Sequence, residues 1–233
     1  MKKITICACS SRTIMKDGEL IRLAVAASKA GWQVELVHDL CEMCEENVPE
    51  LQQVAGTTIV ACHERAVKSL LEWRGVENCT LLNLRGREAT DVLQELGLDS
   101  AEDEALAEQF KEQLDRMPRK MGEDAWYPTL DKDVCGECGK CFDFCPFGVY
   151  EMIDDRVRVV HPHSCKNNCP ACARNCPHSA IIFPKYDRSP INGGVEMQEK
   201  AVQLDSRTAY AEAFRAKLAQ RRAGVSLLKK HEE

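Results

Sequence analysis

Two runs of closely spaced cysteines in the second half of the chain are suited to holding metal clusters. The runs are Cys135-x2-Cys138-x2-Cys141-x3-Cys145 and Cys165-x3-Cys169-x2-Cys172-x3-Cys176, each followed directly by a proline. Cysteine thiolates ligate the irons of iron–sulfur clusters, and three closely spaced cysteines can hold three corners of one [4Fe–4S] cube. Structural zinc sites instead use two CxxC pairs with a longer gap between them, and disulfides belong to oxidising compartments. The runs therefore predict two [4Fe–4S] clusters.

The segment from about Leu130 to Pro184 resembles a bacterial-type 2[4Fe–4S] ferredoxin domain, on the strength of the two runs and their Cys-Pro ends. The resemblance implies one-electron transfer and a fold of two β-hairpin and short-helix halves related by a pseudo-twofold axis. In this arrangement the fourth cysteine of each run ligates the other cube. The expected ligands are Cys135, Cys138, Cys141 and Cys176 for cluster I, and Cys165, Cys169, Cys172 and Cys145 for cluster II.

The sequence around the runs supports such a domain. Apolar-rich segments at 149–153 and 156–160 flank Asp154-Asp155 and predict a hairpin, and a short strand is expected at 180–183. One departure from the usual spacing is an extra residue in the loop Lys166-Asn167-Asn168. We expect cluster II to form despite it, with altered hydrogen bonding and reduction potential.

The first hundred residues predict a small α/β domain with a doubly wound parallel sheet. Strands are expected at 3–7, 33–37, 57–61 and 80–84, and helices at 15–30, 49–55, 64–74 and 90–96. Alternating strands and helices favour a parallel sheet, whose carboxyl edge is where such folds bind ligands. Five cysteines follow the first three strands, namely Cys7, Cys9, Cys41, Cys44 and Cys62. Cys79 precedes the fourth strand, so we expect it at the opposite edge, without a role in the site.

Residues 3–86 are similar to the N-terminal cluster domain found in the large flavin-binding subunit of heterodisulfide reductase and in its relatives. The similar elements are Cys7-Ala8-Cys9, Met43-Cys44, Ile59-Val60-Ala61-Cys62-His63-Glu64-Arg65 and Asn83-Leu84-Arg85. The resemblance implies a third [4Fe–4S] cluster, although that family's cysteine after its Asn-x-Arg element is absent here, as is its flavin-binding domain. The expected ligands are Cys7, Cys9, Cys44 and Cys62, with Cys41 as the substitute. A zinc site and metal-free cysteines, buried or redox-active, stay open as alternatives.

Other polar side chains near these cysteines have simpler expected roles. The hydroxyls of Ser10, Ser11 and Thr13 are expected to cap the following helix. A flavodoxin-like FMN site is the alternative for them, but no glycine-rich phosphate loop is present. The histidines near the cysteines are expected to be hydrogen-bonding neighbours rather than ligands, namely His38, His63, His161, His163 and His178.

We divide the 233-residue chain into four parts. These are an α/β domain over 1–97, an acidic helical connector over 98–129, the 2[4Fe–4S] ferredoxin domain over 130–186, and an irregular segment with a C-terminal helix over 187–233. The connector helix is expected to open at residues 99–103 and to pack on one or both domains. Trp126-Tyr127 is expected either to shield a cluster from water or to fill the domain junction. The C-terminal helix, expected over 205–222, carries an apolar stripe that would pack on its own protein or on another subunit.

Composition excludes several classes of protein. The chain has a net charge of −6 and no basic face with interleaved aromatics, which argues against a nucleic-acid partner. No apolar stretch approaches the roughly 18 residues that a membrane span requires, and the amino-terminal apolar run is too short for a signal peptide. We therefore expect a cytoplasmic protein, in which 14 cysteines serve metal binding rather than disulfides.

Together these features predict an iron–sulfur electron-transfer protein that is a subunit or dedicated partner of a larger anaerobic oxidoreductase. Electrons would enter at one exposed cluster, pass to the second and reach the third. No substrate site is recognisable, so an electron carrier is favoured over an enzyme. The main alternative is a thiol/disulfide redox protein that uses Cys41-x2-Cys44 and is supplied with electrons by the clusters. A regulatory sensor, whose cluster loss changes partner binding, is a further alternative.

Overall fold

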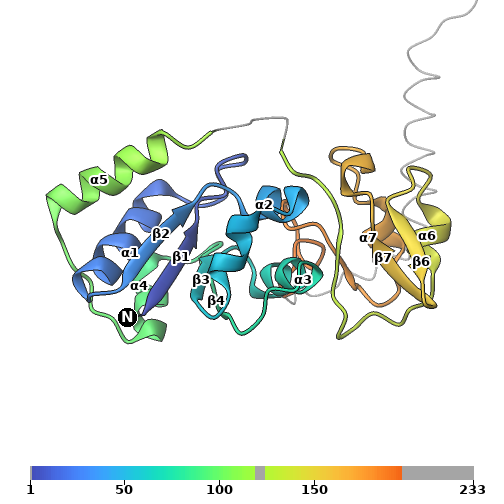
Figure 1. Cartoon of the computed structure of the whole chain (residues 1–233), viewed down its shortest axis with the longest axis horizontal. Coiled ribbons are helices and arrows are strands. Elements are labelled where there is room, and N and C mark those ends of the chain that lie inside the picture. The colour runs from blue at the N-terminus through green and yellow to red at the C-terminus, as the bar shows by residue number, and fades with distance from the viewer. Residues whose placement is uncertain (1, 119–123, 196–233) are drawn as a thin grey trace, which may run out of the picture. The chain divides into compact units, whose positions relative to one another are not determined.

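Four parallel strands form a sheet in the amino-terminal half of the molecule, as the computed structural model shows (Figure 1). The strands are β1 (Lys3–Cys7), β2 (Gln33–Val37), β3 (Thr58–Ala61) and β4 (Thr80–Asn83), in the spatial order β2-β1-β3-β4. Their bounds follow the prediction to within one residue. The predicted α/β class with a parallel sheet is confirmed.

Helices cover both faces of this sheet (Figure 1). One face carries α1 (Asp17–Lys29) and α4 (Ala89–Leu96), and the other carries α2 (Leu40–Glu46) and α3 (Glu64–Trp73), with a 3-10 turn over Pro49–Val54. The central strands supply fully buried aliphatic side chains because parallel strands are covered on both sides. Ile4, Ile6, Ile59 and Val60 have no exposed surface. The core therefore holds the strand ends, and the cysteines that follow them, in fixed positions.

Two helices differ from expectation. Helix α2 was not predicted; Asp39 caps its first turn by accepting hydrogen bonds from the amides of Cys41 and Glu42. The connector helix α5 (Glu104–Asp115) begins directly after the segment 99–103 that was expected to open it, because Asp103 is its N-cap. Phe110 and Leu114 of α5 are buried in the core of the α/β domain, so this helix extends that domain.

The structure describes residues 2–118 and 124–195, all of which belong to one compact unit. Its second part has two antiparallel strand pairs, β5 (Thr129–Leu130) with β8 (Ile181–Ile182) and β6 (Tyr150–Ile153) with β7 (Arg156–Val159). Its helices are α6 (Lys140–Phe144) and α7 (Ala171–Asn175), with a 3-10 turn over Pro162–Ser164. The predicted hairpin is confirmed: Asp154 and Asp155 form its turn with φ of 51° and 57°. The predicted C-terminal helix and its stripe lie outside the described residues.

Aromatic side chains fill the junction between the two parts. Trp126 stacks on Phe183 with ring centroids 5.2 Å apart, and Tyr127 lies 5.3 Å from the ring of Trp73. The hydroxyl of Tyr127 also donates to the carbonyl of Cys41 at 2.6 Å. Of the two roles considered for these residues, filling the junction is the one these contacts describe.

No helix within residues 2–118 and 124–195 is both long enough and apolar enough to cross a membrane.

Candidate cluster sites

Two cavities in the second part are each lined by four cysteines. The first is lined by Cys135, Cys138, Cys141 and Cys176, together with His178 and two glycines of the loop before α6. A Cβ at one of these, Gly136, would lie 2.5 Å from Nε2 of His178, so a side chain there would displace the imidazole. The first cavity thus combines three cysteines of the first run with the last cysteine of the second.

The second cavity has the reciprocal composition. Its cysteines are Cys145, Cys165, Cys169 and Cys172, and its walls include Phe144, Phe147 and Tyr150. The pKa of Cys165 is raised to about 12, first by burial and then by the negative charges of Cys172, Cys169 and Cys145. The structure therefore brings together the two sets of four cysteines that the sequence predicts.

The chemistry of these sites suits iron–sulfur clusters. Burial is the main reason that the pKa of Cys141 is raised to about 12 and that of Cys172 to about 11. Such thiols stay protonated at neutral pH unless a metal replaces their protons. Four sulfur donors and an apolar wall fit a [4Fe–4S] cube, which supplies one-electron redox chemistry when bound.

One hydrogen bond to a cluster-site sulfur comes from the hairpin. The hydroxyl of Tyr150, on β6, donates to Sγ of Cys172 at 3.1 Å. Tyr150 is buried, and this bond lowers the pKa of Cys172 against the larger effect of burial. The contact was not predicted, because nothing in the sequence marks which tyrosine faces the cysteines.

The extra residue between Cys165 and Cys169 contributes to a contact between the two parts. The loop turns back where the amide of Cys169 donates to the carbonyl of Lys166, and Asn168 adopts a left-handed conformation with φ of 59°. The side-chain oxygen of Asn168 then accepts a hydrogen bond from Arg12 at 2.6 Å. The longer loop therefore reaches the α/β domain.

A third group of cysteines is buried at the carboxyl edge of the parallel sheet. Cys7 ends β1, Cys9 follows it, Cys62 follows β3, and Cys41 lies in the first turn of α2. Burial raises the pKa of all four thiols; the next largest cause is Asp39 for Cys7, Cys9 and Cys41, and Cys9 for Cys62. The charge of Cys62 also acts on Cys7 and Cys41, and that of Cys9 on Cys41. These four thiols thus form one group.

Cys44, which the sequence favoured as a ligand, is buried in a different electrostatic environment from these four thiols. After burial, its pKa responds to Arg74 and Asp39 and to no other described cysteine. The guanidinium of Arg74 also donates to the carbonyl of Cys44. Cys44 is three residues beyond Cys41 on α2, about 4.5 Å further along the helix axis.

The remaining polar residues are placed as follows. Cys79 precedes β4 and donates to the carbonyl of Val54 at 3.3 Å, at the predicted amino edge. The expectation that Ser10, Ser11 or Thr13 caps α1 is wrong, because Lys16 is the N-cap and makes no side-chain cap bond. Instead, Ser11 donates to Asp39, and Ser10 donates to the carbonyl of Pro118.

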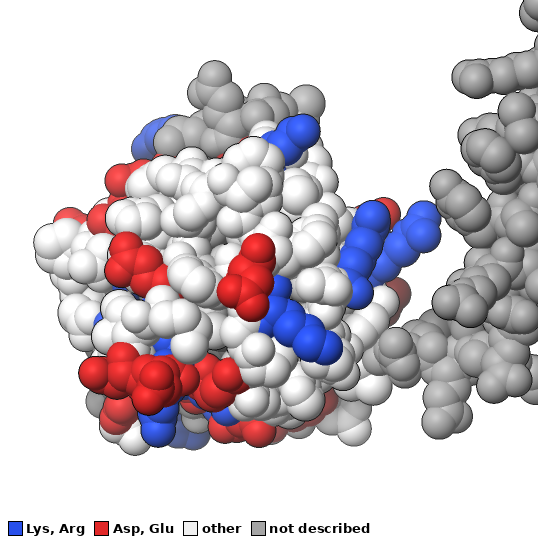
Figure 2. Space-filling model, turned by 90° about the vertical axis from the view of Figure 1, so that its right-hand side faces the viewer, with Lys and Arg blue, Asp and Glu red and all other residues white. Residues whose placement is uncertain are grey.

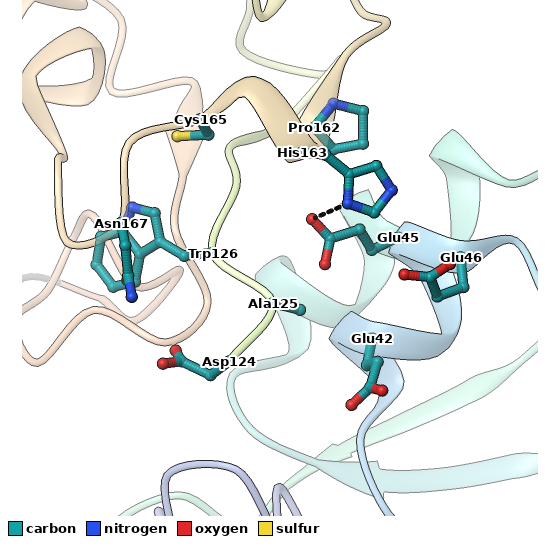
Figure 3. A pocket seen from close by; sticks show the side chains of 10 residues that line it. All are labelled: Glu42, Glu45, Glu46, Asp124, Ala125, Trp126, Pro162, His163, Cys165 and Asn167. Atoms are coloured by element: carbon teal, nitrogen blue, oxygen red, sulfur yellow. Dashed lines mark ion pairs between the residues drawn. The ribbon is translucent and has the colours of Figure 1, made fainter. Parts of the chain in front are cut away.

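Helix α2 lines a separate pocket that shares Cys165 with the second cavity. Figure 3 shows a pocket in which Glu45 of α2 points toward His163, with 3.3 Å between a carboxylate oxygen and Nδ1. Cys165 lines the same pocket, and the charge of Glu45 is among the causes that raise its pKa. The helix that carries Cys41 therefore also carries a carboxylate that acts on a cysteine of the second cavity.

The outer face of the second part is mostly uncharged. Figure 2 shows acidic side chains gathered along one lower edge of this face and a few basic side chains along another. Three phenylalanines of the first run and its surroundings are more than two-fifths exposed: Phe142 (41%), Phe144 (48%) and Phe147 (43%). Two of them, Phe144 and Phe147, also line the second cavity.

Comparison with known proteins identifies this part of the chain. Residues 127–203 match the family model described as a 4Fe-4S dicluster domain. The chain is 38% identical over 55 residues to a ferredoxin of Methanothermococcus thermolithotrophicus. These residues are 23% of this chain and 90% of that protein. The chain belongs to the ferredoxin family. Its predicted ferredoxin domain, its [4Fe–4S] chemistry and the prediction of an iron–sulfur electron-transfer protein are confirmed.

Two further relatives match this chain over only part of their own length. An uncharacterized ferredoxin of Methanocaldococcus jannaschii is 42% identical over 82 residues, which are 35% of this chain and 54% of that protein. Pyruvate synthase subunit PorD of Methanothermobacter marburgensis is 43% identical over 54 residues, which are 23% of this chain and 60% of that protein. The chain thus spans little more than half the length of either.

Proposed function

We propose that the whole chain is an electron-transfer subunit, or the dedicated redox partner, of a larger oxidoreductase, and that it carries three [4Fe–4S] clusters. The similarity to a pyruvate synthase subunit supports the oxidoreductase assignment. The observation that carries the proposal is the group of four buried thiols at the sheet edge, one of which lies on α2, the helix whose Glu45 acts on Cys165 of the second cavity. Anaerobic metabolism of the source organism is part of the proposal.

The proposed ligands of the ferredoxin clusters are the two predicted sets. Cluster I is assigned to Cys135, Cys138, Cys141 and Cys176, and cluster II to Cys165, Cys169, Cys172 and Cys145. For the third cluster we favour Cys7, Cys9, Cys41 and Cys62, because all four are buried and their charges act on one another. Cys41, named as the substitute from the sequence, thus takes the place of Cys44.

The contacts suggest a linear order for the three sites. Cys172 is among the charges that raise the pKa of Cys141, so the first and second cavities are neighbours. Glu45 connects the second cavity to α2 and hence to the amino-terminal thiols. Cluster II would therefore lie between the other two, and the site of cluster I would face a redox partner.

The resemblance of residues 3–86 to the flavin-binding subunit of heterodisulfide reductase supports the third cluster. The Asn83-Leu84-Arg85 element of that resemblance begins at the last residue of β4, at the same sheet edge, where the charge of Arg85 lowers the pKa of Cys62. A thiol/disulfide catalyst is not favoured. Its nucleophile would need an accessible thiol with a depressed pKa, whereas burial raises the pKa of both Cys41 and Cys44.

The proposal is tested by measuring iron, acid-labile sulfide and zinc per chain on protein purified without oxygen. We expect about 12 iron and 12 sulfide atoms per chain and no zinc, because each cube contributes four of each. About 8 iron atoms would restrict the clusters to the ferredoxin domain and refute the third site. With about 8 iron atoms, zinc near one per chain would indicate a structural zinc site in the α/β domain, and no zinc would indicate free thiols there.

A further inference from the structure

A lysine from the end of the ferredoxin domain is buried beside the amino-terminal thiols. Lys185 is 3% exposed and lies just beyond β8, 146 positions along the chain from Asp39. Its ammonium donates to Oδ2 of Asp39 at 2.7 Å and to the hydroxyl of Ser11 at 2.6 Å. A buried charge needs such partners, because each unpaired charge costs several kcal/mol on removal from water.

The backbone around Lys185 is held by two arginines of the α/β domain. Arg85 donates to the carbonyl of Pro184 at 2.8 Å and to that of Tyr186 at 2.6 Å. Arg12 donates to the carbonyl of Lys185 itself at 3.2 Å. Three successive carbonyls are thus bound by side chains that follow β1 and β4, which fixes where the lysine side chain enters the α/β domain.

The residues after Lys185 cover the same edge of the sheet. Asn192 is buried, and glycines are required next to it. A Cβ at Gly193 would lie 2.7 Å from Cβ of Ala66, and one at Gly194 would lie 2.9 Å from Nε2 of His63. Residues 184–194, here called the covering segment, therefore pack closely on the start of α3, next to Cys62.

The buried ammonium of Lys185 would interact with the charge of a cluster held by the amino-terminal thiols. A cube held by four thiolates carries net negative charge, and each electron it accepts adds to that charge. A buried ammonium interacts more strongly with such a charge than a solvated one does, because the interior screens it less. The Lys185 ammonium lowers the pKa of Cys9 and Cys41, against the larger opposing effects of burial and Asp39.

We propose that Lys185 is a positioning residue of the amino-terminal site, supplied by the ferredoxin domain, whose buried ammonium raises the reduction potential of the cluster held there. The inference rests on the proposed third cluster. It also makes the site dependent on both parts of the chain, since its cation comes from the part that holds clusters I and II. Asp39 would lower the reduction potential of the same cluster, because its carboxylate, bonded to Lys185, places a negative charge near Cys41.

The test uses the full chain and three variants measured together. Lys185→Met removes the cation, Asp39→Asn removes the carboxylate while keeping an oxygen to cap α2, and the double variant removes both without leaving a buried charge unpaired. Lys132→Met is the matched control, because Lys132 is an exposed lysine of the same domain. Iron per chain is measured first, followed by the midpoint potential of each cluster in a dithionite titration monitored by EPR.

We expect about 12 iron atoms in each protein and opposite shifts of one cluster potential: downward in Lys185→Met, upward in Asp39→Asn, and smaller than either in the double variant. If Lys185→Met does not fold, the upward shift in Asp39→Asn and the small shift in the double variant still test the charge effect. Twelve iron atoms with no shift, or with shifts of the same sign, would overturn the role of Lys185 and leave the three-cluster proposal standing. About 8 iron atoms in the unaltered chain would refute the third cluster and this inference with it.

Discussion

At the scale of single residues, the structure distinguishes cysteines that the sequence could only group. Parallel strands bring Cys7, Cys9 and Cys62 to one edge, and this convergence was predictable from the strand pattern alone. The choice between Cys41 and Cys44 was not, because it depends on the direction of a short helix. With α2 in place, the charges of Cys62 and Cys9 act on Cys41, whereas that of Arg74 acts on Cys44.

This difference predicts the effect of two substitutions that are alike in chemistry. Cys41→Ser is expected to lower the iron content by about 4 atoms per chain, because one ligand of the third cube is lost. Cys44→Ser is expected to leave the iron content unchanged, and so is the control Cys79→Ser, whose thiol lies at the opposite edge. Iron and sulfide analysis of the three variants checks this. Iron loss in Cys44→Ser but not in Cys41→Ser would show that the ligand assignment is reversed.

A second residue-scale prediction concerns the hydrogen bond to Cys172. Tyr150→Phe removes a donor that stabilises negative charge on this sulfur, so the reduction potential of cluster II is expected to fall. Tyr186→Phe is the control, because its hydroxyl bonds Arg174 instead of a cysteine. EPR-monitored redox titration of both variants measures the effect. Equal potentials in Tyr150→Phe and the unaltered chain would mean that the hydroxyl does not tune the cluster.

At the scale of elements, the sequence was most informative where periodicity was long. The four strands and helices α1, α3 and α4 match their predicted bounds closely, because apolar residues recur over several turns or strands. Helix α2 is only seven residues long and was not predicted. Its capping residue Asp39 was the available signal.

Helix α5 belongs to the α/β domain, and this can be measured. Phe110→Ala would leave a cavity between α5 and the core, because Phe110 is only 6% exposed. We expect the free energy of unfolding to fall by about 3–5 kcal/mol. The neighbouring exposed residue gives the control, Gln109→Ala, which is expected to change it by less than about 0.5 kcal/mol. Anaerobic urea unfolding followed by circular dichroism compares the two, and equal stabilities would mean that α5 does not pack on this core.

At the scale of the whole molecule, the two parts are joined by ion pairs and hydrogen bonds as well as by aromatic packing. Arg65 pairs with Asp131, Lys68 pairs with Asp133, and the indole of Trp73 donates to the carbonyl of Val159 at 3.1 Å. None of these pairings has a local sequence signal, since at least 65 positions separate each of them along the chain. The same is true of Lys185 and Asp39, which explains why a composite site could not be predicted.

The hydrogen bonds from Arg85 predict how the covering segment responds when this arginine is replaced. Arg85→Met removes two charge-assisted hydrogen bonds to the carbonyls of Pro184 and Tyr186. We expect amides within the segment, such as that of Gly193, which donates to Pro190, to exchange with solvent on the order of 10–100-fold faster. Arg87→Met is the control: its side chain pairs with Glu95 at a partly exposed position, where an ion pair contributes about 0–1 kcal/mol. Hydrogen exchange of the metal-loaded chain measures both variants. Unchanged exchange in Arg85→Met would mean that other contacts hold the segment in place. Faster exchange limited to residues 184–194 would show that the hydrogen bonds from Arg85 keep Lys185 beside the amino-terminal thiols.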